Sequence, residues 1–215
     1  MLKKICTFVL LSAIAATANA NLIVNGSFED NAVNPGTWRW FYSADVNGWT
    51  GSNIEIWDDF LGVKAVDGTQ FAELNAHANS GQQFTIAQSF NTTVNSLYDL
   101  SFFYRARRSN DEAFQVSLSN GQSNFFEQIM TDHIVGEWSF FNATFRAASS
   151  TTTLLFSSVQ PHSGTVGNFL DNIVVTGAPT SLSAQPVSEP AAFTLLAIFG
   201  GLFLMRLKKR QFVKK

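Results

Sequence analysis

The sequence predicts an all-β domain over residues 21–176, and three observations support this fold class. Short runs rich in β-branched and aromatic residues follow one another, and several alternate apolar with polar residues, as half-buried strands do. No stretch of this region has helical periodicity of useful length. Residue pairs that favour tight turns separate the runs, at Asn25-Gly26, Asn47-Gly48, Asp67-Gly68 and Asn120-Gly121. Many short strands without helices indicate a β-sandwich or barrel.

Ten runs are expected to form strands. Alternation places Leu100, Phe102 and Tyr104 on one face of their run, and a run over 138–145 requires one bulge to keep its aromatic residues together. Sixteen of the 21 phenylalanines fall between residues 21 and 186, which predicts a core built on phenylalanine. The expected strands are Leu22–Val24, Ile54–Trp57, Phe71–Leu74, Thr85–Phe90, Tyr98–Arg105, Phe114–Leu118, Phe125–Ile129, Trp138–Phe145, Thr152–Ser157 and Asn168–Val175.

The first 20 residues have the pattern of a secretion signal. Lys3 and Lys4 give a basic start, an apolar run from Ile5 to Ile14 follows, and Ala18-Asn19-Ala20 offers small residues for signal peptidase before Asn21. The apolar run is too short to span about 30 Å of hydrocarbon. The only cysteine, Cys6, lies inside this signal, so cysteine-based metal sites and nucleophiles are excluded from the mature chain.

The last 29 residues, 187–215, have three parts in order. Val187-Ser188-Glu189-Pro190 is followed by an apolar segment that extends over 191–207 at most, and a basic cluster closes the chain. A polar linker over 177–186 joins this tail to the domain. The tail resembles the PEP-CTERM sorting signal of Gram-negative bacteria that make exopolysaccharide, although Ser188 stands where a first proline is common.

That resemblance implies processing by an exosortase-like membrane transpeptidase. It also implies a cell-surface or extracellular-matrix location, with membrane association only during sorting. An ordinary C-terminal membrane anchor is the alternative, but the segment is short for a permanent span.

Charge in the domain is strongly asymmetric. Residues 21–186 carry six basic residues against fifteen acidic ones, which gives a net charge of −9. Nucleic-acid binding depends on neutralising phosphates, so this balance argues against a nucleic-acid partner. It is compatible with cations and neutral ligands.

Three pieces of the domain carry a resemblance to a known fold family: an opening piece at 21–29, a middle piece made of 68–74, 87–90 and 98–102, and a closing piece at 169–175. Together they resemble the galactose-binding-domain-like jelly-roll β-sandwich used by many carbohydrate-binding modules. The resemblance implies that Glu29 and Asp171 lie side by side as ligands of a structural calcium ion, with Asp67 or Glu73 as helpers. Calcium accepts six to eight oxygen ligands, so the chemistry fits. The alternative is that Glu29 caps a turn and Asp171 fixes a strand end.

An aromatic cluster is the best candidate for a glycan site. It comprises Trp38, Trp40, Phe41 and Tyr42, joined by Trp49 and Trp57, and Trp38-Arg39-Trp40 is expected in a Gly/Pro/Asn-rich loop. Sugars stack their apolar C–H faces on aromatic rings. Core packing is the alternative for some of these residues, and it is favoured for Trp49 and Trp138.

The only basic run of the domain, Arg105-Ala106-Arg107-Arg108, could orient an acidic polysaccharide through Arg105 and Arg107. Local ion pairs with Asp111 and Glu112 are the alternative.

No catalytic pattern is present in the sequence. The three histidines have no metal-ligand spacing, and Asp58-Asp59 would point to opposite faces of a strand. We therefore expect an exported, non-catalytic surface or matrix protein that binds exopolysaccharide or another glycan. A purely structural or adhesive protein without a defined ligand is the main alternative, and a glycan-active hydrolase is the last.

Overall fold

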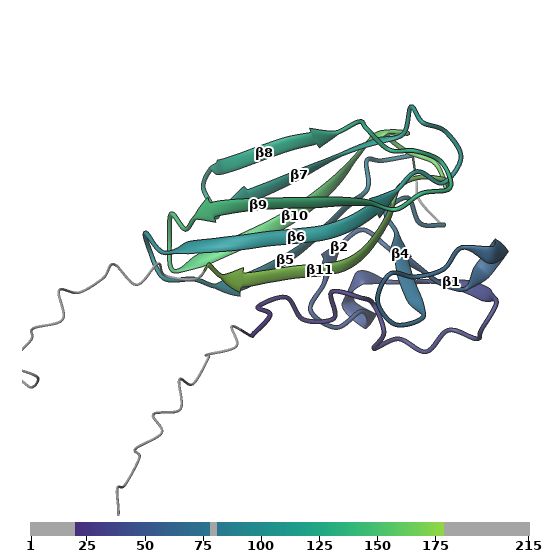
Figure 1. The fold of residues 1–215 in the computed structure, drawn as a ribbon, viewed down its shortest axis with the longest axis horizontal. Helices are drawn as coiled ribbons and strands as arrows, with labels where there is room; N and C mark the ends of the chain where they lie inside the picture. Colours follow the sequence, from purple (N-terminus) through teal and green to yellow (C-terminus); the bar gives the residue numbers. More distant parts are fainter. Residues whose placement is uncertain (1–19, 78–80, 179–215) are drawn as a thin grey trace, which may run out of the picture. The chain divides into compact units, whose positions relative to one another are not determined.

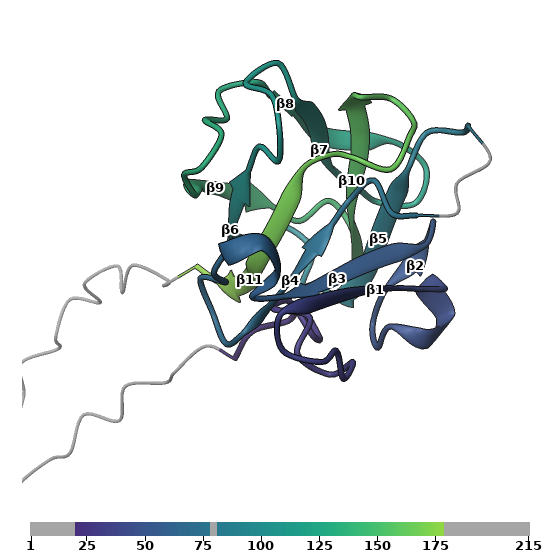
Figure 2. The same ribbon diagram turned by 90° about the vertical axis from the view of Figure 1, so that its right-hand side faces the viewer.

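Two antiparallel sheets packed face to face make up the part of the chain that the computed structural model describes, residues 20–77 and 81–178 (Figure 1). The turned view separates the two layers, with β9, β6 and β11 on one side and β8, β7 and β10 on the other (Figure 2). The predicted all-β sandwich is therefore confirmed. The predicted signal up to Asn19 and the tail from Pro179 lie outside the described residues, and within those residues no helix is long and apolar enough to span a membrane.

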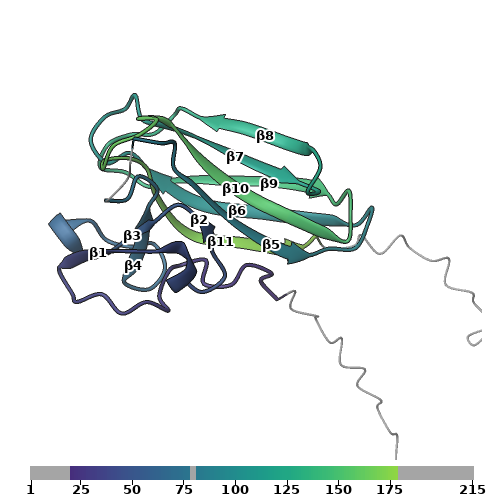
Figure 3. The same cartoon turned by 180° about the vertical axis from the view of Figure 1, so that it is seen from behind.

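The six-stranded sheet has the order β1-β3-β4-β11-β6-β9, and the five-stranded sheet has the order β2-β5-β10-β7-β8 (Figure 3). Two short 3-10 turns, η1 (Ser43–Asp45) and η2 (Phe60–Gly62), interrupt the loops. The bounds of the strands are β1 (Thr37–Phe41), β2 (Thr50–Gly51), β3 (Ile54–Asp58), β4 (Gln70–Glu73), β5 (Thr85–Asn91), β6 (Leu97–Arg105), β7 (Ala113–Ser119), β8 (Asn124–Met130), β9 (Ser139–Arg146), β10 (Thr151–Gln160) and β11 (Phe169–Gly177).

Phenylalanine rings fill the space between the sheets, as predicted. Phe102 of β6 stacks on Phe141 of β9 at 4.7 Å within its own sheet and meets Phe156 of β10 edge-on at 5.1 Å across the core. Phe114 of β7 lies 6.0 Å from both Phe102 and Phe156. These residues are fully or almost fully buried, so β6, β7 and β10 alternate inward and outward as the sequence pattern indicates.

The N-terminal strand prediction is wrong. The backbone N–H of Leu22 does pair with the carbonyl of Val175 on β11, at 2.8 Å. The next two N–H groups donate to side chains, Ile23 to Asn21 Oδ1 and Val24 to Gln88 Oε1, so no ladder forms. Asn25 then adopts a positive φ of 51°, which ends the extended segment.

The bulge predicted over 138–145 is also wrong. β9 pairs with β6 without a shift, from Tyr104 opposite Ser139 to Leu97 opposite Arg146. Phe141 and Phe145 face the core, Phe140 faces outward, and Trp138 precedes the strand. The aromatic side chains of this run thus lie on both faces of the sheet, and a regular strand without a bulge accommodates them.

The segment 37–41 is a strand and not the predicted loop. β1 pairs antiparallel with β3, so that Trp38 lies opposite Trp57 and Trp40 lies opposite Glu55. The alternating bulky residues of Thr37-Trp38-Arg39-Trp40-Phe41 are typical of a strand. The preceding Pro35-Gly36 turn, with Gly36 at a φ of +74°, starts it.

Both ends of the described chain attach to β11. The Asn21 side chain accepts a hydrogen bond from the Val175 N–H and donates one to the Ile173 carbonyl. The Ala178 N–H, just past the end of β11, donates to the Leu97 carbonyl at the start of β6. The chain therefore enters and leaves the sandwich close together.

One buried histidine gives the fold a testable pH dependence. His133 is 2 % exposed and lies edge-on to the rings of Tyr104 and Phe114, and burial lowers its pKa against the weaker opposing effects of Asp132 and Asn168. The unfolded chain binds a proton near the ordinary pKa of about 6.5 and the folded protein does not. His133 therefore contributes stability above that pH, and the contribution is lost as the pH falls below it.

We expect His133→Phe to remove this loss. Between pH 7.5 and 5.5 the wild type should lose up to about 1.4 kcal/mol per pH unit relative to the variant, measured by urea unfolding. Asp171, whose pKa burial raises to about 7, has the opposite slope, but it is common to both proteins and cancels. Equal slopes in the two proteins would show that His133 is protonated as easily in the folded state as in the unfolded one.

Candidate functional site

Aromatic side chains gather around β1, the edge strand of the six-stranded sheet. Trp38 is 38 % exposed and Tyr42 is 59 % exposed, and Trp40 is half-buried. Trp40 and Tyr42 meet edge-on at 5.2 Å, and Trp38 lies 6.1 Å from the ring of His77. The pairing with β3 puts Trp38 and Trp40 on the outward face of the sheet, so their rings are available to a ligand.

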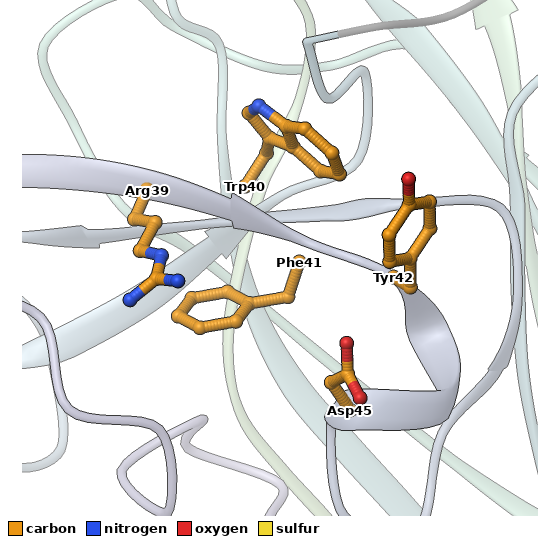
Figure 4. Close-up of a pocket in the computed structure, with 5 residues that line it drawn as sticks. All are labelled: Arg39, Trp40, Phe41, Tyr42 and Asp45. Carbon is orange, nitrogen blue, oxygen red and sulfur yellow. The ribbon is translucent and has the colours of Figure 1, made fainter.

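The other side of the same strand adds charged groups. Figure 4 shows Arg39 and Phe41 on one side of β1, Trp40 on the other, and Asp45 on the turn that follows. The Arg39 guanidinium carbon lies 5.0 Å from the centre of the Phe41 ring, a cation–π contact that fixes its position. These residues line an open pocket of about 280 Å³. We call this set (Arg39, Trp40, Phe41, Tyr42, Asp45), together with Trp38, the β1 site.

Trp57 lies beneath the β1 site and not at the surface. It is 1 % exposed and packs against Phe60, Phe71 and Phe169 in a second, smaller hydrophobic cluster on the outer side of the six-stranded sheet. Its Nε1 donates to Glu55 Oε1 at 2.8 Å. Trp57 thus supports the β1 site from below. Trp138 joins the same cluster, and Trp49 lies in the main core, as the sequence favours.

A buried charged network joins this cluster to the loops. Glu73 of β4 is fully buried and lies opposite Glu55 of β3. Arg107 Nη1 contacts both oxygens of Glu73 at 2.7 and 2.8 Å, and the Gly167 N–H donates to Oε1. Burial raises the pKa of Glu73, and the Arg107 charge opposes that rise. The Arg107 guanidinium carbon also lies 4.7 Å from the centre of the Trp57 ring.

The two arginines predicted as ligand contacts therefore differ. Arg107 is committed to Glu73, Trp57 and the Thr165 carbonyl, and the neighbouring loop is held by Glu112, which accepts the N–H groups of Arg107 and Arg108. Arg105 forms no salt bridge among the described residues. The structure does not bring either arginine to the β1 site.

The three predicted calcium ligands hold one loop. Glu29 Oε1 accepts the N–H groups of Thr69 and Gln70, at 2.8 and 2.6 Å. Asp171 Oδ2 accepts those of Val66 and Asp67, and Asp67 Oδ2 accepts the Ser27 hydroxyl. Any side chain at Gly68, which has a φ of +70°, would collide with the Glu29 carboxylate.

These carboxylates do not form an ion cage as they are arranged. In the described part of the chain, no three acidic, histidine or cysteine side chains converge as metal ligands. Both oxygens of Asp171 are directed at backbone N–H groups, including that of Asn172. The calcium site stays a prediction, and the contacts that are present clamp residues 66–70 between the start and the end of the domain.

The fold and site define a β-sandwich with an aromatic surface at one sheet edge. The chain belongs to the DUF642 family, described as a protein of unknown function, whose family model matches residues 21–176. A curated relative, halomucin of Haloquadratum walsbyi, is 26 % identical over 204 residues. That match covers 85 % of this chain and 2 % of halomucin, so the chain spans only a small part of the relative's length.

Solved structures match this chain at low sequence identity. The arabinose-bound α-L-arabinofuranosidase MgGH51 has a TM-score of 0.50 at 15 % identity, covering 74 % of this chain and 26 % of that one. The module TmCBM61 in complex with β-1,4-galactotriose has a TM-score of 0.45 at 15 % identity, covering 74 % of this chain and 99 % of that one. The similarity to MgGH51 shows a common fold and nothing about function.

The role of Glu29 can be tested together with the calcium prediction. Glu29→Ala removes the acceptor of two backbone N–H groups, so we expect it to lower the free energy of unfolding by about 1–3 kcal/mol. If calcium binds here, a chelator should lower the melting temperature of the wild type and leave that of Glu29→Ala unchanged. A wild-type melting temperature that does not respond to chelation would contradict the calcium prediction and leave the clamp intact.

Proposed function

We propose that this protein binds glycan through the β1 site and has no catalytic activity. The observation that carries the proposal is the aromatic row of Trp38, Trp40 and Tyr42, in which Trp38 and Tyr42 are exposed and Trp40 is half-buried. The guanidinium of Arg39, on the other side of the strand, and the carboxylate of Asp45, on the following turn, line the same pocket as Trp40. Sugar rings have apolar C–H faces and polar edges, so a surface of aromatic faces flanked by a donor and an acceptor suits them.

The support beneath the aromatic row favours binding. Trp38 and Trp40 lie on a strand paired with β3, and Trp57 of that strand is fixed by Glu55 and by the Arg107 guanidinium. A site that is rigid before the ligand arrives loses less conformational entropy on binding. The hydrogen bond from Asn31 to the Asp45 carbonyl holds the turn on the far side of the pocket.

Two carboxylates side by side raise the question of hydrolysis, and their environment argues against it. A glycosidase needs two carboxyl groups that face one scissile bond across an open cleft. Glu55 and Glu73 are 3 % and 0 % exposed, and their oxygens accept bonds from Trp57, His77, Arg107 and Gly167. This pair is engaged in holding loops, so we propose binding without cleavage.

Binding at the β1 site can be tested with sugars of the kinds bound in the similar structures, such as arabinose and β-1,4-galactotriose, and with a wider glycan array. We expect Trp40→Ala to raise the dissociation constant at least tenfold, about 1.4 kcal/mol, measured by titration calorimetry. Ile129→Ala, which removes an exposed apolar side chain from β8 in the other sheet, is the matched control. A wild type that binds no glycan would favour the structural or adhesive alternative.

We also propose that the protein is exported and sorted to the cell surface or extracellular matrix of a Gram-negative bacterium. The basic and apolar start and the tripartite end of the sequence support this. Signal peptidase and an exosortase-like transpeptidase are the implied partners. Mass spectrometry of the mature protein should give a chain that begins at Asn21 and ends near Glu189. A C-terminus at Lys215 would contradict processing and indicate a lasting anchor.

A further inference from the structure

A second aromatic surface lies near the opposite edge of the six-stranded sheet. Phe103 of β6 and Phe140 of β9 are directly opposite each other, with ring centres 4.9 Å apart. Both point outward, because Phe102 and Phe141 beside them face the core. Phe140 is 56 % exposed. The Phe140 ring therefore packs on Phe103 and still leaves much of its apolar surface open to solvent.

Polar side chains continue this surface along the same two strands. Ser101 lies opposite Asn142, and Asp99 lies opposite Thr144, whose hydroxyl donates to the Asp99 carboxylate at 2.6 Å. Asn142 is exposed and Ser101 is half-buried. The outward row therefore has aromatic rings at one end and amide and hydroxyl groups at the other. These suit the apolar C–H face and the hydroxyl groups of a sugar, respectively.

Arg105 supplies a cation at the other end of the row. It is two residues after Phe103 on β6, so it shares the outward face and lies about 7 Å further along the strand. Its Nε is enclosed and has no hydrogen-bond partner, and burial lowers the pKa of this arginine. The residue as a whole is only half-buried and its guanidinium forms no salt bridge among the described residues, so an approaching carboxylate would give that charge a partner through a charge-assisted bond.

Arg107, in the same region, differs from Arg105 because its guanidinium has ionic, hydrogen-bonding and aromatic partners. Two residues further along, it contacts Glu73 twice, the Thr165 carbonyl and the face of Trp57. No acidic side chain in the described ranges pairs with Arg105, although the domain is rich in acids. Arg105 therefore lies on this face without a counterion, as does Arg146 at the other end of β9, whose Nη1 donates to the Asn95 carbonyl.

We propose that the outward face of β6 and β9 is a second carbohydrate site, specific for sugars that carry a carboxylate. We call it the β6–β9 site and define it by Asp99, Ser101, Phe103, Arg105, Phe140 and Asn142. The sugar ring packs on Phe140 and Phe103, its hydroxyls bond to Asn142 and Ser101, and its carboxylate pairs with Arg105. The proposal rests on the proposed function in one respect, namely that the domain is a glycan binder.

The two sites are separate. β1 and β6 are four strand spacings apart in the sheet order, which is about 19 Å. The cluster of Trp57, Phe71, Phe169 and Trp138 lies between them. One oligosaccharide of two or three sugars therefore cannot occupy both sites, and a polysaccharide, or two of them, can.

The test uses the full chain in a detergent without a sugar headgroup and removes the β1 site first. In a Trp40→Ala background, we expect titration calorimetry to show binding of oligogalacturonate. Adding Phe140→Ala should raise its dissociation constant at least tenfold. Adding Arg105→Gln should weaken oligogalacturonate binding at least fivefold. In the protein with an intact β1 site, Arg105→Gln should leave the binding of β-1,4-galactotriose, the uncharged probe, unchanged. Arg108→Gln and Ile129→Ala in the same background are the controls for charge and for exposed apolar surface.

The outcomes separate the two proposals. Oligogalacturonate binding that is absent in Trp40→Ala, or equal with and without Phe140→Ala, would overturn the β6–β9 site and leave the β1 site standing. Glycan binding that does not change with Trp40→Ala but falls with Phe140→Ala would overturn the β1 site and support the second one. Because Phe140 is exposed, its replacement should keep the circular dichroism spectrum and the melting temperature of the parent.

Discussion

The contact between Phe102 and Phe156 across the core determines most of what the surface can do. Once Phe102 faces inward at 5.1 Å from its partner, the period of two in a strand fixes every other residue of β6. Leu100 and Tyr104 face the core together with Phe102, so Phe103 and Arg105 must face outward. A shift of one residue would exchange the core for the outward row, so the packing of one ring pair sets the chemistry of both faces.

The outer side of the six-stranded sheet is built as a second layer. Its centre is an apolar cluster around Trp57, and its charged members, Glu55, Glu73 and Arg107, use their bonds to hold three loops, at His77, Arg107 and Gly167. Burying charge is expensive unless each group is paired and hydrogen-bonded. Glu73 is paired with Arg107, and Glu55 accepts hydrogen bonds from Trp57 Nε1 and the His77 N–H. The consequence is a firm floor between two aromatic surfaces, one at β1 and one at β6 and β9.

Sequence patterns were sufficient where burial on one face alone decided the structure. The runs holding Phe102 and Phe114 alternate cleanly, and both are strands with the predicted inward residues. They were insufficient where partners distant in sequence decided it. Nothing local shows that Trp57 is covered, that Arg107 meets Glu73 34 residues away, or that Val24 bonds to Gln88 in place of a strand. The rows of exposed aromatics are likewise visible only once β1 is paired with β3 and β6 with β9.

The attachment of both chain ends to β11 has a consequence for how such a domain can be used. Asn21 and Ala178 leave the sandwich beside the same strand, so the fold can be placed within a longer polypeptide without stretching either neighbour. Because the two ends are close together, a host protein could accept the domain as an insertion with little distortion at the point of insertion. The inserted domain would bring both of its outward aromatic surfaces to the host protein.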